Sequence, residues 1–270
     1  MKNFKKAIVL SVVAIFTVAL FAGCGNSSSN EKTQNSLEKV KKAGVLKVGL
    51  EDSFPPMEFR DSKNVLQGFD VDMANAIGEK LGVKTEFVCT EFNGIVLALK
   101  SGKFDVIISG LSISEDRKKE IDFSEPYIEN SQIVVTKTGN DAIKTSKDLT
   151  GKTIGVGLGT TSEKVAEGLT GLKEVKKYDK TTEELQDLLI GRIDAVIVDE
   201  PVGRYYISAD DQKGKYTVLS EKLTSEPMGI GFRKGDKELE EAVQKAVNDL
   251  KKDGTMSKIS TKWFGEDIYK

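Results

Sequence analysis

The sequence predicts an α/β protein made of two similar lobes. After residue 36, short apolar runs alternate with stretches of helical periodicity, which is typical of parallel sheets built from βαβ units. The same order of elements occurs twice, and the closest repeat is GKFDVIISG in the first half against GRIDAVIVD in the second. The chain of 270 residues is long enough for two small domains, with one large domain as the alternative.

The first half contains three predicted strands and two predicted helices. Val45–Leu50 is an apolar run of strand length, and Phe69–Gly82 places apolar side chains close to helical spacing before a terminal glycine. Residues 84–90 predict the next strand, residues 92–102 a helix, and Phe104–Gly110 a third strand.

The second half repeats that order. Its predicted elements are a strand at 152–158, a helix at 161–169, a strand at 173–178, a helix at 181–191 and a strand at 193–199. Two matched halves predict two sheets of similar build, one in each lobe.

Residues 1–23 have the layout of a secretory signal peptide. Lys2, Lys5 and Lys6 precede an uncharged apolar run that ends at residue 22, and this run is shorter than the ~20 residues of a spanning helix. The stretch LFAGC resembles the lipobox of bacterial lipoproteins, which implies lipidation of Cys24 after cleavage. An uncleaved anchor helix is the alternative. Residues 24–36 are small and polar, so we expect a linker between the anchor and the folded body.

The composition excludes several classes of function. A formal net charge of −2 offers no basic stripe for nucleic acid. The absence of histidine excludes Ser-His and Cys-His catalysis and imidazole metal sites, and we expect neither a metal nor a cofactor. Apart from Cys24 the chain has one cysteine, Cys89, which cannot form an internal disulfide once Cys24 is lipidated. We expect Cys89 to be a small core residue, with a reactive thiol as the alternative.

Polar residues gather where the predicted strands end. Ligands of open α/β sheets bind beyond the carboxyl ends of the strands. Four strand ends carry the sequences EDSF, SGLS, GTTS and DEP, which bring together two acids, several hydroxyls, an aromatic ring and glycines. This composition predicts a site for a small polar ligand in a cleft between the lobes.

Two predicted helix starts are suited to an anion. In SISEDRKKE, Ser112 or Ser114 can cap a helix, and Arg117 can hold a carboxylate bidentately. In GLGTTSEK, Thr160 and Glu163 have the spacing of a capping box. For SISEDRKKE, a capped surface helix with a solvated arginine is the alternative. The glycines here do not complete GxGxxG and no GK[ST] follows, which disfavours nucleotide binding.

Two acids and two aromatic residues complete the candidate site. Glu51 and Asp199 each close a predicted strand, on opposite lobes, and each alone is equally typical of a helix cap or a surface charge. Phe54 lies in SFPPMEF beside two prolines, where local packing is the alternative. Phe92 begins a predicted helix, where a core position is the alternative.

Six motifs in order resemble the extracellular solute-binding proteins of polar amino-acid ABC transporters, bacterial solute-binding protein family 3. They are GVLKVGLEDSFPPMEF, LQGFDVDMANAIGEKLG, ALKSGKFDVIISGLSISEDRKKEIDFSEPY, GKTIGVGLGTTSE, GRIDAVIVDE and LKKDGTMSKISTKWFG. The resemblance implies a periplasmic-binding-protein-like α/β fold, in which a two-strand hinge joins two lobes around a ligand cleft. It places the first lobe at 37–126 plus 228–270 and the second at 127–227.

The resemblance also implies the ligand contacts. Arg117 and the backbone around Gly110 and Ser112, with Thr161, would hold the α-carboxylate of an amino acid. Asp199, together with Ser109 and Gly110, would hold the α-ammonium, and the side-chain pocket would be formed by Glu51, Phe54 and Phe92, with glutamate where many members carry aspartate. The complete expected set is Glu51, Phe54, Phe92, Ser109, Gly110, Leu111, Ser112, Arg117, Gly159, Thr160, Thr161 and Asp199.

The resemblance predicts a receptor that passes a polar amino acid to a membrane permease and ATPase and does no chemistry on it. We expect a monomer, lipid-anchored at the outer face of the cytoplasmic membrane. Since Arg117 and Asp199 cancel the charges of the ligand backbone, Glu51 is left as a surplus carboxylate, which favours arginine and then lysine. A glutamine or cystine receptor, a secreted dehydratase on the same fold and a sensory ligand-binding domain are the alternatives.

Overall fold

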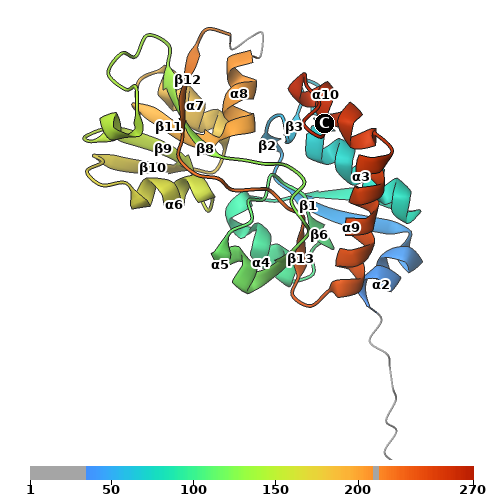
Figure 1. The fold of residues 1–270 in the computed structure, drawn as a ribbon. Coiled ribbons are helices and arrows are strands. Elements are labelled where there is room, and N and C mark those ends of the chain that lie inside the picture. Colours follow the sequence, from blue (N-terminus) through green and yellow to red (C-terminus); the bar gives the residue numbers. More distant parts are fainter. Residues whose placement is uncertain (1–34, 209–212) are drawn as a thin grey trace, which may run out of the picture. The chain divides into compact units, whose positions relative to one another are not determined.

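The structure, a computed structural model, describes residues 35–208 and 213–270 (Figure 1). The predicted signal peptide, Cys24 and most of the predicted linker lie outside the described residues. Helix α2 (Ser36–Ala43) is capped by Asn35, whose Oδ1 accepts the backbone N–H of Glu38 at 2.8 Å. The helix therefore begins one residue before the predicted start of the first lobe.

Two five-stranded sheets form the centres of two lobes (Figure 1). The first has the order β5-β1-β6-β13-β7, formed by β1 (Val45–Leu50), β5 (Lys84–Cys89), β6 (Val106–Ile107), β7 (Ile121–Phe123) and β13 (Gly231–Arg233). The second has the order β10-β9-β11-β8-β12, formed by β8 (Gln132–Lys137), β9 (Thr153–Gly157), β10 (Glu174–Tyr178), β11 (Ala195–Asp199) and β12 (Tyr216–Lys222).

The two sheets repeat one topology. In each sheet the second strand of the order, β1 or β9, pairs in parallel with both of its neighbours. The two remaining pairings of each sheet are antiparallel. The repeated sequences GKFDVIISG and GRIDAVIVD supply β6 and β11, which occupy the same position in the two sheets. The predicted two-lobed α/β fold is confirmed.

Two details of the first lobe differ from the prediction. The strand expected over Phe104–Gly110 is paired only at Val106–Ile107, because the chain turns out of the sheet where Gly110 takes a left-handed φ of 51°. A small sheet that the sequence did not predict is formed by β2 (Ser53–Phe54), β3 (Glu58–Arg60) and β4 (Leu66–Gln67). Strands of two or three residues are too short to show a period-two pattern.

Helices cover both sheets. In the first lobe they are α3 (Phe69–Leu81), α4 (Ile95–Lys100), α5 (Glu115–Glu120), α9 (Lys237–Lys252) and α10 (Thr255–Phe264), after the 3₁₀ turn η1 (Phe92–Gly94) that precedes α4. In the second they are α6 (Thr161–Gly168), α7 (Thr181–Leu189) and α8 (Glu200–Ser208), with the 3₁₀ turn η2 (Ser146–Leu149). Their apolar faces and the strands enclose fully buried side chains such as Leu46, Val48, Ile77, Val196 and Val202.

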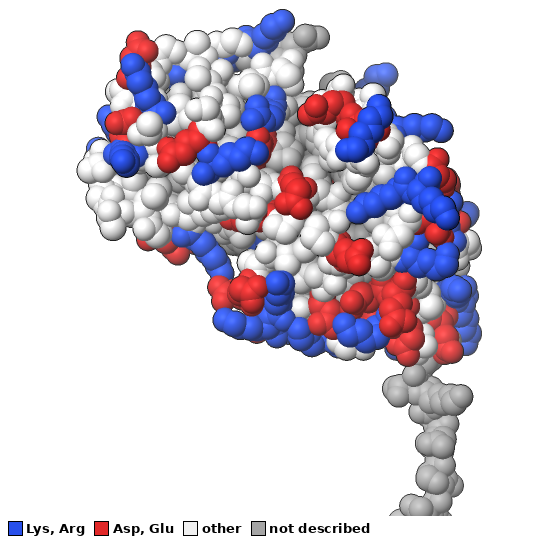
Figure 2. All heavy atoms as spheres, in the orientation of Figure 1, with Lys and Arg blue, Asp and Glu red and all other residues white. Residues whose placement is uncertain are grey.

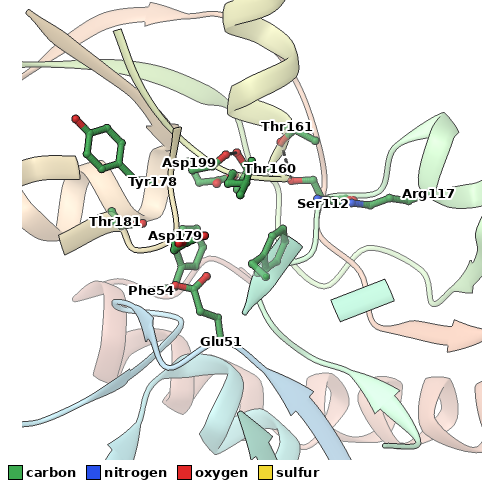
Figure 3. A pocket seen from close by; sticks show the side chains of 14 residues that line it. Glu51, Phe54, Ser112, Arg117, Thr160, Thr161, Tyr178, Asp179, Thr181 and Asp199 are labelled. Atoms are coloured by element: carbon green, nitrogen blue, oxygen red, sulfur yellow. Dashed lines mark hydrogen bonds between the residues drawn. The ribbon is translucent and has the colours of Figure 1, made fainter. Parts of the chain in front are cut away.

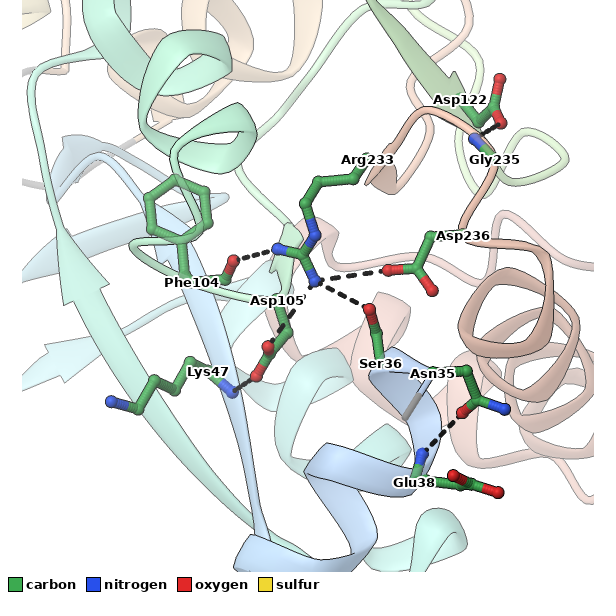
Figure 4. Close-up of polar contacts among 10 residues, drawn as sticks. All are labelled: Asn35, Ser36, Glu38, Lys47, Phe104, Asp105, Asp122, Arg233, Gly235 and Asp236. Atoms are coloured by element: carbon green, nitrogen blue, oxygen red, sulfur yellow. Dashed lines mark hydrogen bonds and ion pairs between the residues drawn. The ribbon is translucent and has the colours of Figure 1, made fainter. Parts of the chain in front are cut away.

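The C-terminal segment returns to the first lobe. Helices α9 and α10 pack against α3, and α9 also contacts α2, as Figure 1 shows. Arg233, at the end of β13, fixes this return by donating to the carbonyl of Phe104 at 2.6 Å and to Ser36 Oγ at 3.2 Å (Figure 4). One guanidinium thus joins β13 to the start of α2 and to the loop before β6.

Two antiparallel segments connect the lobes. Tyr127 N–H donates to the carbonyl of Met228 at 3.0 Å, and Met228 N–H donates to Ile128 at 2.9 Å. A further backbone bond runs from Glu226 N–H to Asn130 at 2.8 Å. We call residues 127–130 and 226–228 the crossing segments; they contain the positions proposed as lobe boundaries.

Cys89 differs from its expected place in the core. It is half-buried at the end of β5, and its Sγ accepts a hydrogen bond from Arg60 Nη2 at 3.3 Å. The edge position of β5 in its sheet leaves this strand only partly covered. Burial raises the pKa of the Cys89 thiol above its ordinary value, which disfavours the reactive thiolate.

Charged residues of both signs are interspersed over the face of the molecule drawn in Figure 2, without a continuous basic stripe. Among residues 35–208 and 213–270, no helix combines the length and the apolar character that crossing a bilayer requires.

Candidate functional site

A cavity lies between the two lobes at the carboxyl ends of their parallel strands (Figure 3). Its wall combines carboxyl groups, hydroxyl groups, one guanidinium and aromatic rings, which suits a small polar ligand. Nine of the twelve residues expected at the site line it, namely Glu51, Phe54, Phe92, Gly110, Ser112, Arg117, Thr160, Thr161 and Asp199. In the first lobe these residues follow β1, β5 and β6 or lie on β2 and α5, and in the second they lie at the ends of β9 and β11.

The other three expected residues lie just behind the cavity wall. Ser109 is fully buried, and its Oγ accepts the N–H of Glu51 at 3.0 Å. Leu111 is fully buried in the apolar cluster of β6 and α4. The carbonyl of Gly159 accepts a hydrogen bond from Arg117. These three residues therefore support side chains that line the cavity.

Arg117 stands at the junction of the lobes. Its Nη1 donates to the carbonyl of Ser112 in the first lobe at 2.9 Å, and its Nη2 donates to Gly159 in the second at 3.1 Å. The guanidinium carbon lies 5.2 Å from the centre of the Phe92 ring. Burial lowers the pKa of Arg117 to about 10, so it stays charged at neutral pH, and no carboxylate of the described residues forms an ion pair with it. It can therefore bind an anionic group in the cavity.

One of the two helix starts matches the prediction and the other differs in detail. Of the two serines predicted as caps, Ser114 caps α5 by accepting the N–H of Arg117 at 3.3 Å. Thr160 caps α6, but Glu163 completes no capping box, because its carboxylate accepts the N–H of Gly159 at 2.6 Å. The N–H of Thr160 instead donates to Gly157.

Ser112 and Thr161 meet across the cleft. Their hydroxyl oxygens are 3.4 Å apart, and Thr161 also accepts a hydrogen bond from Gln132 Nε2 at 3.1 Å. The same Nε2 donates to Asp199 Oδ1 at 2.8 Å. Gln132, which is fully buried, thus fixes two residues of the cavity wall from behind.

Asp199, the last residue of β11, presents a buried carboxyl group to the cavity. Asn130 and Gln132 both donate to its Oδ1. Burial raises the pKa of Asp199 to about 7, against the lowering effect of the Asn130 hydrogen bond. The donors that the described residues supply fall on one oxygen, which leaves the other to accept from a ligand cation.

Glu51 faces the cavity from the end of β1 and is 8% exposed. Burial raises its pKa to about 7, and the neighbouring Glu91 adds to the effect, while a 2.5 Å hydrogen bond from Ser53 opposes it. Lys180 lowers the pKa of Glu51, but by less than burial raises it, so no cation among the described residues keeps this pKa in its ordinary range.

The backbone of Gly110 is arranged differently from the expectation. Its N–H donates to Asp70 Oδ2 at 2.7 Å and so is not available for a ligand carboxylate. The left-handed turn at Gly110 admits no side chain, because a Cβ there would lie 2.7 Å from the Phe54 ring. The glycine lets the chain pass close beneath the ring that lines the cavity.

Five residues of the second lobe also line the cavity without having been predicted, namely Gly157, Leu158, Tyr178, Asp179 and Thr181. Tyr178 ends β10, and Asp179 follows it directly. The rule that ligands bind at carboxyl ends of strands applies to this strand as well, so its end sequence YDKTT was the available signal.

Glu184 lies behind this wall and is almost completely buried, with no partner for its Oε1 among the described residues. Burial raises its pKa well above the ordinary value, and Asp199 and Glu51 raise it further. In the described part of the chain, no cluster of three or more histidine, cysteine, aspartate or glutamate residues has the arrangement of a metal site.

Comparison with known proteins gives a consistent result. The family model of bacterial extracellular solute-binding proteins, family 3, matches residues 46–266. The chain is 37% identical to the L-cystine-binding protein TcyJ of Escherichia coli (strain K12), over 96% of this chain and 97% of that protein. It is 33% identical to the arginine-binding extracellular protein ArtP of Bacillus subtilis (strain 168), over 96% of this chain and 98% of that protein.

Solved structures agree with this assignment. An ancestral arginine-binding protein, solved with arginine and with glutamine, shares 48% identity with this chain at a TM-score of 0.78. The match to the glutamine-bound form covers 83% of this chain and 99% of that one, and the match to the arginine-bound form 82% and 99%. The chain is a member of the bacterial extracellular solute-binding proteins, family 3.

Proposed function

We propose that this protein binds a cationic amino acid, arginine before lysine, between its lobes and delivers it to the permease and ATPase of an ABC importer. The relatives described above are named for the amino acids that they bind, arginine and cystine. The protein leaves its ligand chemically unchanged, in contrast to a dehydratase. Long incubation of arginine with the protein, followed by chromatography, is expected to return the amino acid intact.

The charge balance of the cavity carries the proposal. Three ionisable carboxyl groups line it, Glu51, Asp179 and Asp199, against one cation, Arg117. Arg117 and Asp199 are suited to the α-carboxylate and α-ammonium of an amino acid. Glu51 and Asp179 then remain as surplus acids, and a side chain with positive charge offsets them.

The aromatic residues favour a guanidinium over an ammonium. Phe54 and Tyr178 line the cavity, and planar guanidinium stacks on aromatic rings better than an ammonium does. Arg117 already lies over one face of Phe92, so Phe92 holds the protein's own arginine in place. Cystine, with two carboxylates, fits less well because the cavity wall has a single guanidinium.

Removing either surplus acid tests this proposal. Glu51→Gln and Asp179→Asn keep the side-chain shape and remove a negative charge, so each is expected to weaken arginine binding and shift preference toward glutamine. Isothermal titration calorimetry measures both affinities, with Glu183→Gln on the exposed face of α7 as the control. Unchanged preference for arginine in both cavity variants would refute the role of the charge surplus.

We also propose that Cys24 is lipidated and anchors the protein outside the cytoplasmic membrane. The signal-like N-terminus and LFAGC support this proposal. Cys24→Ala is expected to abolish incorporation of labelled palmitate while arginine binding persists. Equal labelling of the variant would show that the lipid is attached elsewhere.

A further inference from the structure

Two acids that do not line the cavity meet directly beneath its floor. Glu58 lies on β3 and Asp70 in the first turn of α3, and both are fully buried. Ser109, also fully buried, and Tyr127, 2% exposed on a crossing segment, lie beside them. Burial of two carboxyl groups together needs a physical explanation, since an unpaired buried charge is strongly unfavourable.

One oxygen of each acid has donors. Ser109 Oγ donates to Glu58 Oε1 at 2.7 Å. Asp70 Oδ2 accepts the N–H of Gly110 at 2.7 Å and the hydroxyl of Tyr127 at 3.0 Å. Both residues follow β6: Gly110 lines the cavity floor and Ser109 lies directly behind it, so both acids hold that floor.

The remaining oxygens, Glu58 Oε2 and Asp70 Oδ1, find no donor among the described residues. The two carboxyl groups are within hydrogen-bonding reach of each other. The other titratable groups that act on the pair are Glu51, Tyr127 and Tyr269, and among the described residues no lysine or arginine forms an ion pair with either acid. Two carboxylates at this distance cannot both ionise, whereas one shared proton satisfies both orphaned oxygens.

We propose that Glu58 and Asp70 share one proton, carried by Glu58 and donated to Asp70, and that this pair positions the cavity floor against a crossing segment. The assignment to Glu58 follows from the hydrogen bonds, because Asp70 has two other donors and is the better anion. Burial raises the pKa of Glu58 well above its ordinary value, and Asp70 raises it further.

The hydrogen bonds of the pair connect the cavity floor with a crossing segment. Through Ser109 it holds the N–H of Glu51, through Gly110 the turn under Phe54, and through Tyr127 a crossing segment. Loss of the proton would set two buried negative charges against each other at this junction. The inference concerns the floor itself and does not depend on which amino acid is bound.

Glu58→Gln tests the shared proton. Glutamine donates from Nε2 to Asp70 and accepts from Ser109 at Oε1, so it reproduces the hydrogen bonds without the proton. A group whose pKa is raised by folding stabilises the protein fully below its unfolded pKa, and that contribution falls as the pH rises toward the folded pKa. The unfolding constant of the wild type, divided by that of Glu58→Gln, is therefore expected to increase about tenfold per pH unit from about pH 5 upward.

Urea unfolding at several pH values measures this ratio, with the exposed Glu86→Gln as the control that leaves the pH dependence unchanged. A ratio that stays constant between pH 5.5 and 7.5 would overturn the shared proton.

Hydrogen exchange tests the positioning role. Glu58→Ala removes the partner of Asp70 and Ser109, so the amide of Gly110 is expected to exchange faster, and Glu58→Gln is expected to restore protection. Strand β11 in the other lobe serves as the internal comparison. Equally faster exchange of the Gly110 amide and of the β11 amides would indicate general destabilisation and would contradict the positioning role. Full protection of the Gly110 amide in Glu58→Ala would contradict it as well.

Discussion

At the scale of single residues, Arg117 joins the two lobes, and we propose that it also binds the carboxylate of the ligand. Its guanidinium donates to one carbonyl in each lobe and lies over Phe92, which fixes its direction. Sequence alone could not distinguish this residue from a solvated arginine on a capped helix, because the contact with Gly159 joins positions far apart in the chain. The half-buried guanidinium has no ion-pair partner among the described residues, which favours a role at the site.

Arg117→Ala is expected to weaken arginine binding by about 2–5 kcal/mol, the usual cost of truncating one partner of a buried charge pair. Arg117→Lys is the matched variant, since it keeps the charge but loses the fork that spans Ser112 and Gly159. Titration calorimetry should give the highest arginine affinity for the wild type, a lower one for Arg117→Lys and the lowest for Arg117→Ala. The melting temperatures of the three proteins should lie within a few degrees of one another. Wild-type affinity in Arg117→Ala would indicate that Arg117 is a solvated side chain on a capped surface helix.

At the scale of elements, the turn after β6 shapes the floor of the cavity. Gly110 takes φ 51°, and a Cβ there would lie 2.7 Å from Phe54. Gly102 offers a comparison, because it has φ 77° and open space around its Cβ position. Both positions penalise alanine by about 1–2 kcal/mol for the left-handed backbone, but only Gly110→Ala adds a steric conflict.

We therefore expect Gly110→Ala to lower both the melting temperature and the arginine affinity, and Gly102→Ala to lower only the melting temperature, by a smaller amount. Differential scanning calorimetry and binding titrations of the two variants compare them. Equal melting temperatures, or intact binding in Gly110→Ala, would show that this turn tolerates a side chain.

The elements also show what sequence could predict. Alternating apolar runs gave the strands and helices of both lobes, and the rule for strand ends brought together Glu51, Ser112, Arg117 and Asp199. Asp179 was not predicted because it follows β10, a mostly polar and only partly buried strand whose end is not marked by an apolar run. The acids beneath the floor were missed for a stronger reason: Glu58 and Asp70 come together from different elements, and their burial leaves no mark in local periodicity.

At the scale of the whole molecule, two lobes are connected by the two crossing segments and contact each other across the cleft. Asp116 and Lys164 form an ion pair between the lobes, beside the contact of Arg117 with Gly159. Both contacts join one lobe to the other, so they would have to break if the lobes rotated apart at the crossing segments. This geometry is suited to hinge closure on a ligand.

Small-angle X-ray scattering tests this closure. Saturating arginine is expected to reduce the radius of gyration, because ligand bridging the lobes favours the closed arrangement. Glutamate, whose negative side chain conflicts with Glu51 and Asp179, serves as the control and should leave the profile unchanged. Identical profiles with and without bound arginine would contradict a hinge-closing receptor.

The central claim is that the surplus of carboxyl groups in the cavity selects a cationic amino acid. Titration calorimetry of the wild-type protein, freed of bound ligand by unfolding and refolding, tests it most directly with arginine, lysine, glutamine and cystine in one buffer. The account predicts the tightest binding for arginine, then lysine, with glutamine and cystine weaker. Binding of glutamine or cystine without measurable binding of arginine or lysine would contradict it.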